Sequence, residues 1–319
     1  MLGMIEADSM DDLYAGLYNI VASNGMDYSP RGKACIELRP FVFQINMPQY
    51  GLYTGRSRRL NYRFLAIETL CYLSGISGNL HTQLILDANK NMAFAVNPET
   101  QLFDGAYGPA LRQSMGVVID TLKKDLYSRQ AVASIWSYTT AKSHVAGDSK
   151  DVPCTCLLQF LVEKNRHGGS DMLSMNVYMR SNDLNWGSPY DVAAFCIIQT
   201  FVADILGLEY GYYNHMAGSL HFYEDGNSDG ERPPTIADPS VERWIPELHL
   251  PSIANCDISS WDEIEDVTRD MCEHILLQRN AGVDWKDVEL ITSKVHGIQL
   301  MQKTFQDLIR FRHEKIEKP

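Results

Sequence analysis

Apolar side chains recur at helical spacing in five parts of the chain. In the first of these, Leu13, Leu17 and Val21 share one face and Asn24-Gly25 ends the pattern, which is typical of an opening helix. The long apolar stripe over 192–206 predicts a central helix, whereas the last two stretches are amphipathic. The expected helices are 10–24, 60–73, 192–206, 264–277 and 288–311.

Short apolar runs and alternation of apolar with polar residues indicate extended segments. Between 34 and 45 such runs predict one strand or a bent pair of strands, and the segment 163–171 predicts a hairpin connection. We expect 77–113 to form loops and short elements around a helix, and 225–234 to form an exposed loop. The remaining expected strands are 131–136, 154–162, 174–179 and 221–223.

The chain has 319 residues, 45% of them hydrophobic, so it is long enough to bury a large core. We expect residues 1–240 to form the main domain and residues 241–319 to form a mostly helical C-terminal extension packed on it. The N-terminal apolar run is short and follows acidic residues, which predicts neither a signal peptide nor a membrane span. A soluble, cytoplasmic protein that does not bind a membrane is therefore expected.

The formal net charge is −12, which disfavours broad attraction to nucleic acid because such binding needs a basic face. If the protein binds a phosphate group, a few well-placed arginines must do so. The seven cysteines are scattered through apolar segments and are expected to be mostly reduced packing residues. Cys154-Thr155-Cys156 has no second Cys or His pair at ligand spacing, so we expect no metal site.

The most informative residues lie in two neighbouring stretches. Pro153-Cys154 is followed by Gln159-Phe160, and Arg180-Ser181-Asn182-Asp183 precedes Gly187-Ser188-Pro189-Tyr190-Asp191. This order resembles the thymidylate synthase family, in which Pro-Cys and Gln-Phe precede Arg-Ser-x-Asp, a glycine and Pro-Phe-Asn. Further matches between about positions 31 and 223 are Glu68 with Leu70 and Gly75, Tyr107-Gly108, Ser128-Arg129 and Gly218-Ser219-Leu220-His221-Phe222-Tyr223.

The resemblance carries expectations about fold and assembly. It implies an α/β fold of the α+β type, with a large bent mixed sheet, a buried central helix and surrounding helices. Residues 1–240 would be the catalytic domain, and two chains would form a homodimer with shared active sites. The substrate would be a pyrimidine nucleoside monophosphate, and 5,10-methylenetetrahydrofolate would be the co-substrate.

The chemistry of one-carbon transfer explains the catalytic candidates. A thiolate that adds to C6 of a pyrimidine makes C5 nucleophilic, and Cys154 is the candidate nucleophile. A nearby guanidinium favours the thiolate, and the resemblance assigns that place to Arg180. It also implies that Glu68 organises water and proton transfers, that Tyr107 supports proton removal at C5, and that Asp191 contacts the base.

The remaining candidates would bind the rest of the substrates. The planar guanidinium suits bidentate pairing with a phosphate. By the resemblance, Arg31, Arg180 and Ser181 hold the phosphate from one subunit, and Arg129 reaches in from the partner. His221 and Tyr223 would hold the sugar 3′-hydroxyl, and Asp183 would contact the folate.

Each of these residues also has a less specific interpretation. A cysteine in an apolar strand is usually a packing residue, a histidine beside aromatic residues is usually a satisfied core residue, and Arg31 or Arg129 would ordinarily be solvated. Their joint occurrence in family order favours an active enzyme. Cys156 would share a face with Cys154 in a regular strand, but the Pro-Cys and Cys-to-Gln spacings favour Cys154.

Asp191 stands where thymidylate synthases have an asparagine. The asparagine amide accepts from N3–H and donates to O4 of uracil, whereas cytosine presents the reverse order of donor and acceptor. A carboxyl accepts from the cytosine amino group and, if it shares a proton, also serves N3. Asp191 therefore favours cytosine, and together with Thr155 and Ser219 it resembles the deoxycytidylate hydroxymethylase branch, in which water captures the one-carbon unit.

The predicted function is thus conversion of dCMP or CMP to its 5-hydroxymethyl form. The alternatives are a thymidylate synthase, a deoxyuridylate hydroxymethylase, and a catalytically idle homologue that binds a nucleotide. Three departures from the family pattern leave folate binding and closure of the site open. Gln130 replaces the second arginine, the tryptophans expected upstream of Tyr107 are not found, and the closing C-terminal segment is not recognisable.

Overall fold

Two β-sheets and a stack of helices make up the computed structural model, which describes residues 4–55, 58–147, 151–165, 168–223, 248–254, 256–290 and 298–311. The strands are β1 (Met4–Ala7), β2 (Met26–Tyr28), β3 (Cys35–Leu38), β4 (Phe41–Ile45), β5 (Val132–Ser134), β6 (Thr155–Glu163), β7 (Met172–Met179), β8 (Asn182–Asp183), β9 (Glu209–Ala217) and β10 (Leu220–Tyr223). The α-helices are α1 (Met10–Asn24), α2 (Tyr62–Leu73), α3 (Gly78–Ala88), α4 (Gly108–Lys124), α5 (Tyr138–Ala146), α6 (Ser188–Leu206), α7 (Trp261–Asn280) and α8 (Ile298–Arg310). Short 3₁₀ turns are η1 (Pro30–Gly32), η2 (Pro48–Tyr50), η3 (Lys90–Ala95) and η4 (Trp285–Asp287).

The larger sheet is mixed and has the strand order β1-β4-β9-β7-β6-β5. Its β1–β4 and β7–β9 pairs are parallel, and its other pairs are antiparallel. The smaller sheet has the order β2-β3-β10-β8, with only the β10–β8 pair parallel. The expected α/β fold with a large mixed sheet is therefore confirmed.

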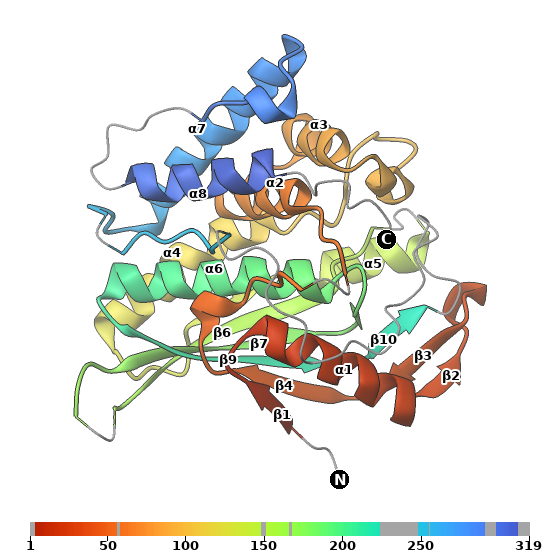
Figure 1. Cartoon of the computed structure of the whole chain (residues 1–319), viewed down its shortest axis with the longest axis horizontal. Helices are drawn as coiled ribbons and strands as arrows, with labels where there is room; N and C mark the ends of the chain where they lie inside the picture. The colour runs from red at the N-terminus through yellow and green to blue at the C-terminus, as the bar shows by residue number, and fades with distance from the viewer. Residues whose placement is uncertain are drawn as a thin grey trace, which may run out of the picture.

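Helix α6 lies directly on the larger sheet and forms the centre of the molecule (Figure 1). Most of its side chains are apolar, on every side of the helix, and nearly all of its residues are buried, which is the pattern of an internal helix. Pro189 opens the helix and Gly207, in the left-handed conformation, ends it. Of the described helices, α6 is also the one that is long and apolar enough to cross a membrane by composition, but the sheet and neighbouring helices enclose it.

Helices α2, α7 and α8 form a further layer above α6 (Figure 1). Ser260 caps the start of helix α7: its hydroxyl oxygen accepts from the N–H of Glu263, and its hydroxyl donates to the carboxylate of the same residue. Both α7 and α8 pack against α2, the helix that carries Glu68. The division expected at residue 240 lies outside the described residues, so the two-part organisation stays a prediction.

Most long elements agree with the sequence pattern. Helices are confirmed at 10–24 and 60–73, and the segment 34–45 forms the predicted pair of strands. Helix α6 begins four residues earlier than expected, and α8 begins at Ile298 rather than at 288, because 288–290 is not helical. Strand β9 was not predicted, the mixed region 77–113 holds α3 and the start of α4, and the loop expected at 225–234 lies outside the described residues.

The start of α4 approaches the end of α2 very closely at Gly108. A Cβ atom at this position would lie 2.6 Å from the carbonyl oxygen of Cys71 and 2.8 Å from that of Ile76. Both neighbours are backbone atoms, which cannot rotate away. Only glycine therefore lets α4 start here, and the preceding Tyr107 is placed by this contact.

Gly108→Ala should destabilise the protein by about 2 kcal/mol, because the added methyl group meets backbone on two sides. The matched control is Gly116→Ala in the same helix, where a Cβ atom would meet nothing within 4 Å. That change should stabilise the protein by about 0.5–1 kcal/mol through helix propensity. Urea unfolding followed by circular dichroism measures both, and equal midpoints for the two variants would contradict the close contact.

Candidate active site

Cys154 immediately precedes β6, and its partly buried side chain lies beside the guanidinium of Arg180. Nη2 of Arg180 lies 3.7 Å from Sγ of Cys154. The guanidinium also donates to the carbonyl oxygens of Pro153 at 3.0 Å and Val152 at 2.9 Å, and its centre lies 5.4 Å from the ring of Trp136. The backbone that carries the sulfur therefore also holds the cation next to it.

A β-bulge separates Cys154 from Cys156. Thr155 pairs with Met179, but Leu157 pairs with Tyr178, so Cys156 is an extra residue in the β6–β7 ladder. The regular alternation that would put both cysteines on one face is therefore interrupted. The short contact from the Arg180 side chain is made to Cys154.

Burial dominates the protonation of the Cys154 thiol. Burial and, more weakly, the negative charges of Asp191 and Asp151 raise the pKa, Arg180 and Arg31 oppose them, and the net value is about 11. The expected effect of Arg180 on the thiolate is present, but burial outweighs it in the protein without substrate. The free thiol is therefore neutral at pH 7.

Tyr107 contacts the backbone that carries the candidate Cys154. Its hydroxyl oxygen accepts hydrogen bonds from the backbone N–H groups of Cys154 at 3.1 Å and Thr155 at 3.2 Å. Its ring stacks on Tyr72, with centroids 5.0 Å apart. Burial raises the pKa of Tyr107 well above its ordinary value, so the hydroxyl is neutral and keeps its own hydrogen as a donor.

Two buried carboxyl groups, those of Glu68 and Asp191, also lie near one another in this cluster. Glu68 projects from the middle of α2, where burial, followed by the charge of Asp191, raises its pKa to about 8, although a hydrogen bond from Tyr72 lowers it. Asp191 lies in the first turn of α6, where burial raises its pKa to about 7. A hydrogen bond of 2.9 Å from Asn182 opposes this shift. At neutral pH, Glu68 is mostly protonated and Asp191 is near its midpoint.

His221 and Tyr223 project from β10 and meet edge to face, with ring centroids 5.2 Å apart. Nδ1 of His221 lies 3.2 Å from the hydroxyl oxygen of Ser219. Ser219 is in turn hydrogen-bonded to the buried Glu37 of β3, whose carboxylate pairs with Arg39 at 2.5 and 2.7 Å. A continuous chain of polar groups therefore fixes the His221 ring.

Electrostatics explain the ionised state of Glu37 in that chain. Burial alone would raise the pKa of this carboxyl, but the hydrogen bonds from Arg39 and Ser219 and the charges of Arg39 and His221 outweigh burial, so the pKa is lowered. A buried carboxylate with a bidentate arginine partner is a strong acceptor. It keeps the Ser219 hydroxyl, and through it the His221 ring, in one orientation.

Arg31 and Asp183 complete the group around β10. Arg31 adopts a left-handed conformation with φ of 56°, hydrogen-bonds Tyr223, and lies near enough to Cys154 to lower the pKa of its thiol. Asp183 pairs with His221 across the parallel β8–β10 ladder, and its Oδ1 accepts from two backbone N–H groups of the following loop. Such a φ at an arginine is uncommon and is typical of functional positions.

The structure thus brings most of the predicted residues together, but not all of them. Cys154, Glu68, Tyr107, Asp191 and Arg180 form one cluster, and Arg31, Asp183, His221 and Tyr223 lie next to it. Ser181 directly follows Arg180 in the turn before β8. Arg129 is exposed and lies elsewhere: its carbonyl accepts from Gln159, five residues along β6 from Cys154, about 15 Å away.

Several residues of the site were not singled out from the sequence. Tyr72, Glu37 and Trp136 carry no motif and are recognisable only by their contacts. Asn182 and Ser188 do lie in the Arg-Ser-Asn-Asp to Pro-Tyr-Asp stretch, but between the residues that carry the resemblance. Their signal is that both are polar and yet buried, which requires hydrogen-bond partners.

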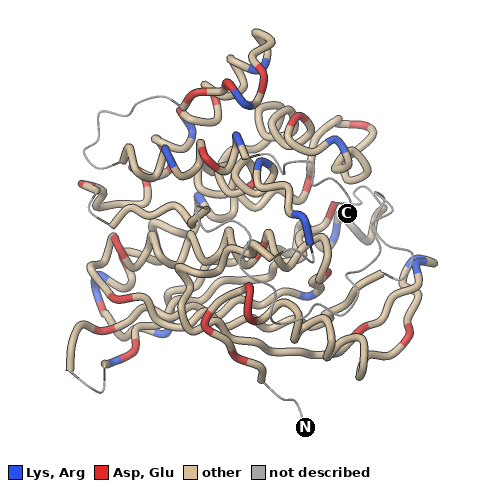
Figure 2. The backbone as a smooth tube through the Cα atoms, in the orientation of Figure 1, with Lys and Arg blue, Asp and Glu red and all other residues tan. Residues whose placement is uncertain are grey.

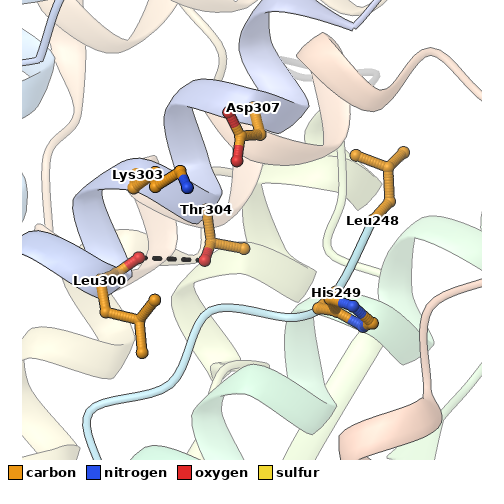
Figure 3. Close-up of a pocket in the computed structure, with 6 residues that line it drawn as sticks. All are labelled: Leu248, His249, Leu300, Lys303, Thr304 and Asp307. Carbon is orange, nitrogen blue, oxygen red and sulfur yellow. Dashed lines mark hydrogen bonds between the residues drawn. The ribbon is translucent and has the colours of Figure 1, made fainter. Parts of the chain in front are cut away.

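Elsewhere in the described part of the chain, neither the distribution of basic residues nor a pocket beside α8 indicates a site made of the predicted residues. Figure 2 shows lysines and arginines scattered over the described part of the chain, without one continuous basic stripe. A pocket of about 170 Å³ lies between α8 and the segment beginning at Leu248, and it contains none of the predicted site residues (Figure 3). The residues that line it are Leu248, His249, Leu300, Lys303, Thr304 and Asp307.

Comparison with known proteins gives consistent matches. A family model described as thymidylate synthase matches residues 14–276. A deoxyuridylate hydroxymethyltransferase of Bacillus phage SP01 is 33% identical over 229 residues, which are 67% of this chain and 57% of that protein. A thymidylate synthase of Mycoplasma genitalium is 32% identical over 124 residues, which are 37% of this chain and 39% of that protein. The aligned part of the chain thus spans little more than half of the first relative.

The buried thiol predicts slow alkylation of Cys154 in the free protein. At pH 8 its thiolate fraction should be on the order of a hundredfold below that of an ordinary cysteine, and the rate should keep rising toward pH 11. Arg180→Ala should slow the reaction further, because the opposing positive charge is lost. Peptide-resolved mass spectrometry with iodoacetamide measures this, and a midpoint at or below pH 8 would show that burial does not control the thiol.

Proposed function

Because the chain belongs to the thymidylate synthase family, we propose that it transfers a one-carbon unit to C5 of a pyrimidine nucleoside monophosphate. The observation that carries this proposal is the contact between Cys154 and Arg180, surrounded by Glu68, Tyr107 and Asp191. A nucleophile, a cation, a neutral hydroxyl and two carboxyl groups with raised pKa values are gathered in one partly buried place. Such a set suits addition to an unsaturated ring followed by proton transfer.

The first step proposed is addition of the Cys154 sulfur to C6. The ring electrons then move to C4=C5, and for cytosine the negative charge that reaches N3 is neutralised by a proton from Asp191. This leaves C5 as an enamine carbon able to attack an electrophile. The thiol proton passes to water as the sulfur adds, and binding of the ring beside Arg180 is the step that favours the thiolate.

Later proton transfers are assigned to Glu68 and Tyr107. With a pKa of about 8, Glu68 is able both to release and to take up a proton near neutral pH. Tyr107 faces the same region and, with its hydroxyl oxygen already bound by two backbone N–H groups, acts as a hydrogen-bond donor. These two groups would handle the removal of the C5 proton through water.

The phosphate and sugar would be bound by the residues at the edge of the cluster. Arg180, Ser181 and Arg31 would hold the phosphate, and Arg31 is already positioned by its hydrogen bond to Tyr223. His221 and Tyr223 would hold the 3′-hydroxyl. The bonds that fix the His221 ring support this role, because a fixed ring loses little freedom when it binds.

The co-substrate proposed is 5,10-methylenetetrahydrofolate, which supplies the electrophilic one-carbon unit when it is bound. Asp183 suits a pterin ring, which presents N–H donors, because its carboxyl is held by backbone N–H groups beside His221. Trp136, next to Arg180, offers an aromatic surface in the same area. We further propose that the protein acts in the cytoplasm, where folates and nucleotides are available.

Asp191 is the basis for proposing dCMP or CMP as the substrate. A carboxyl near its midpoint at pH 7 is able to donate a proton to N3 and to accept from the amino group of cytosine. The product proposed is the 5-hydroxymethyl nucleotide, formed with water. A second candidate is dUMP, which is favoured by the name of the phage SP01 relative.

A homodimer with shared sites is proposed from the outer face of the larger sheet. Tyr213, His215 and Ala217 of β9 point into the core, so Tyr212 and Met216 point outward. The outward side chains include several large exposed apolar groups, as expected of a face that is covered by a partner. They are Val132, Tyr178, Tyr212 and Met216. Arg129, whose carbonyl is bound by Gln159 five residues along β6 from its own Cys154, would then complete the partner's phosphate site.

The activity is tested with dCMP, CMP and dUMP, each with 5,10-methylenetetrahydrofolate in water labelled with heavy oxygen. We expect a labelled 5-hydroxymethyl product from a cytosine nucleotide, and none from Cys154→Ser, because the attacking sulfur is missing. Asp191→Asn should move the preference toward dUMP. A methyl product would identify a synthase, and a failure to release tritium from C5 of any of the three would rule out the activity.

Shared sites are tested by mixing two inactive variants. Cys154→Ala and Arg129→Ala should each lose most of their activity, but subunit exchange should restore up to about a quarter of it, because half of the dimers would contain one intact site. A 1:1 mixture measured before and after reversible dissociation gives the result. Continued inactivity of a dimer whose exchange is proven would argue against a partner arginine in the site.

A further inference from the structure

Asn182 connects Asp191 to the interior of the protein. It is almost fully buried, and its backbone is anchored in β8, where its N–H donates to the carbonyl of Ser219. Its side-chain Nδ2 donates to Oδ2 of Asp191 at 2.9 Å. The hydroxyl of Ser188, also buried, donates to Oδ1 of Asn182. The bond from Ser188 thus determines which end of the Asn182 amide faces Asp191.

The two oxygens of Asp191 are therefore not equivalent. Oδ2 accepts from Asn182 and is also enclosed by the backbone of Gly187, where a Cβ atom would lie only 2.9 Å from it. In the part of the chain that the structure describes, no side chain forms a hydrogen bond with Oδ1. An oxygen that already accepts a hydrogen bond from an amide N–H is less basic than one that does not. In the neutral acid the proton is therefore carried by Oδ1.

The position of that proton matters because a neutral carboxyl is symmetric in shape. With the proton on one oxygen it matches the donor and acceptor order of cytosine, and with the proton on the other it matches uracil. An aspartate alone would therefore accept both bases by moving its proton. A neighbour that fixes the proton converts this ambiguous group into a selective one.

We propose that Asn182 is a positioning residue that, held by Ser188, fixes the proton of Asp191 on Oδ1 and thereby sets the selectivity between cytosine and uracil. This inference rests on the proposed function, because it concerns the group that contacts the base. It assigns Asn182 and Ser188 no contact with the substrate. Both act only through Asp191.

Other titratable groups face Asp191 from α2, from the residues just before α4 and β6, and from β8 and β9. The charge of Asp183 raises the pKa of Asp191, and the charge of Asp191 raises the pKa values of the others. Among the influences on the pKa of Asp191, only the hydrogen bond from Asn182 is directed at one of the two oxygens, and it lowers that pKa. The neighbours are Glu68, Tyr72, Tyr107, Cys154, Asp183 and Tyr213.

The test compares Asn182→Ala, Ser188→Ala and wild-type protein in two measurements. The first is an infrared titration of the Asp191 carboxyl without substrate, with its band assigned by its loss in Asp191→Asn. Removal of the donor should shift the titration to higher pH, because the carboxylate loses a stabilising bond. Ser188→Ala should shift it in the same direction by less, because the amide is then free to turn.

The second measurement is the ratio of kcat/KM for tritium release from dCMP and from dUMP. In Asn182→Ala this ratio should change about tenfold and come closer to one. A change of that size corresponds to the loss of one hydrogen bond to a charged or polar group. The falling limb of the pH profile for the preferred base should move to higher pH as well. If Asn182 had only a structural role, its replacement would lower the rate for both bases. It would change neither the ratio of kcat/KM values nor the position of the falling limb of the pH profile.

The matched control is Asn185→Ala, a buried amide just after β8 whose side chain accepts from Tyr14 rather than bonding Asp191. It should leave both the titration and the ratio unchanged. Unchanged values in both Asn182→Ala and Ser188→Ala, or equal changes in the control, would overturn the proposal. An inactive wild-type protein would contradict the proposed function, and the infrared titration would still decide whether Asn182 orients the Asp191 proton.

Discussion

Loss of water around ionisable groups is the constraint on which the site depends. Cys154, Glu68 and Asp191 lie where burial favours their neutral forms, and for each of them burial is the largest influence on the pKa. The fold makes this possible by placing these groups between α2, α6 and the start of β6, with backbone and side-chain donors beside them. As a result, Glu68 and Asp191 titrate near the pH at which a general acid or base is useful, whereas the Cys154 thiol stays neutral there.

Much of the fold could be predicted from the pattern of apolar residues, because long elements with a continuous apolar side give a clear pattern in the sequence. Helices α1, α2 and α6 are of this kind. Strand β9 gives no such pattern, because the residues that it turns inward are not branched aliphatic ones. They are Gly211, Tyr213, His215 and Ala217. Its alternation is regular, but it is not an alternation of hydrophobicity. Partners on both sides, β4 and β7, hold it in place.

The site was predictable where chemistry depends on a recognisable order of residues, and not where it depends on contacts across the fold. Cys154, Arg180 and Asp191 belong to the first kind, and the structure places them in one cluster. Tyr72, Trp136 and Asn182 belong to the second, because each acts through a neighbour that is distant in sequence or lies on another element. The β-bulge at Cys156 is of the same kind, since the mismatch appears only when β6 is paired with β7.

The bond between Glu37 and Ser219 has a consequence for the imidazole of His221. The acidic group that influences this ring stands on β3, the strand beside β10, and is connected to the ring through the Ser219 hydroxyl. Side chains from two segments that are distant in sequence therefore act as one electrostatic unit. Replacement of Glu37, which lies outside the residues that carry the family resemblance, would alter the environment of the imidazole although its own hydrogen-bonding partner had not changed.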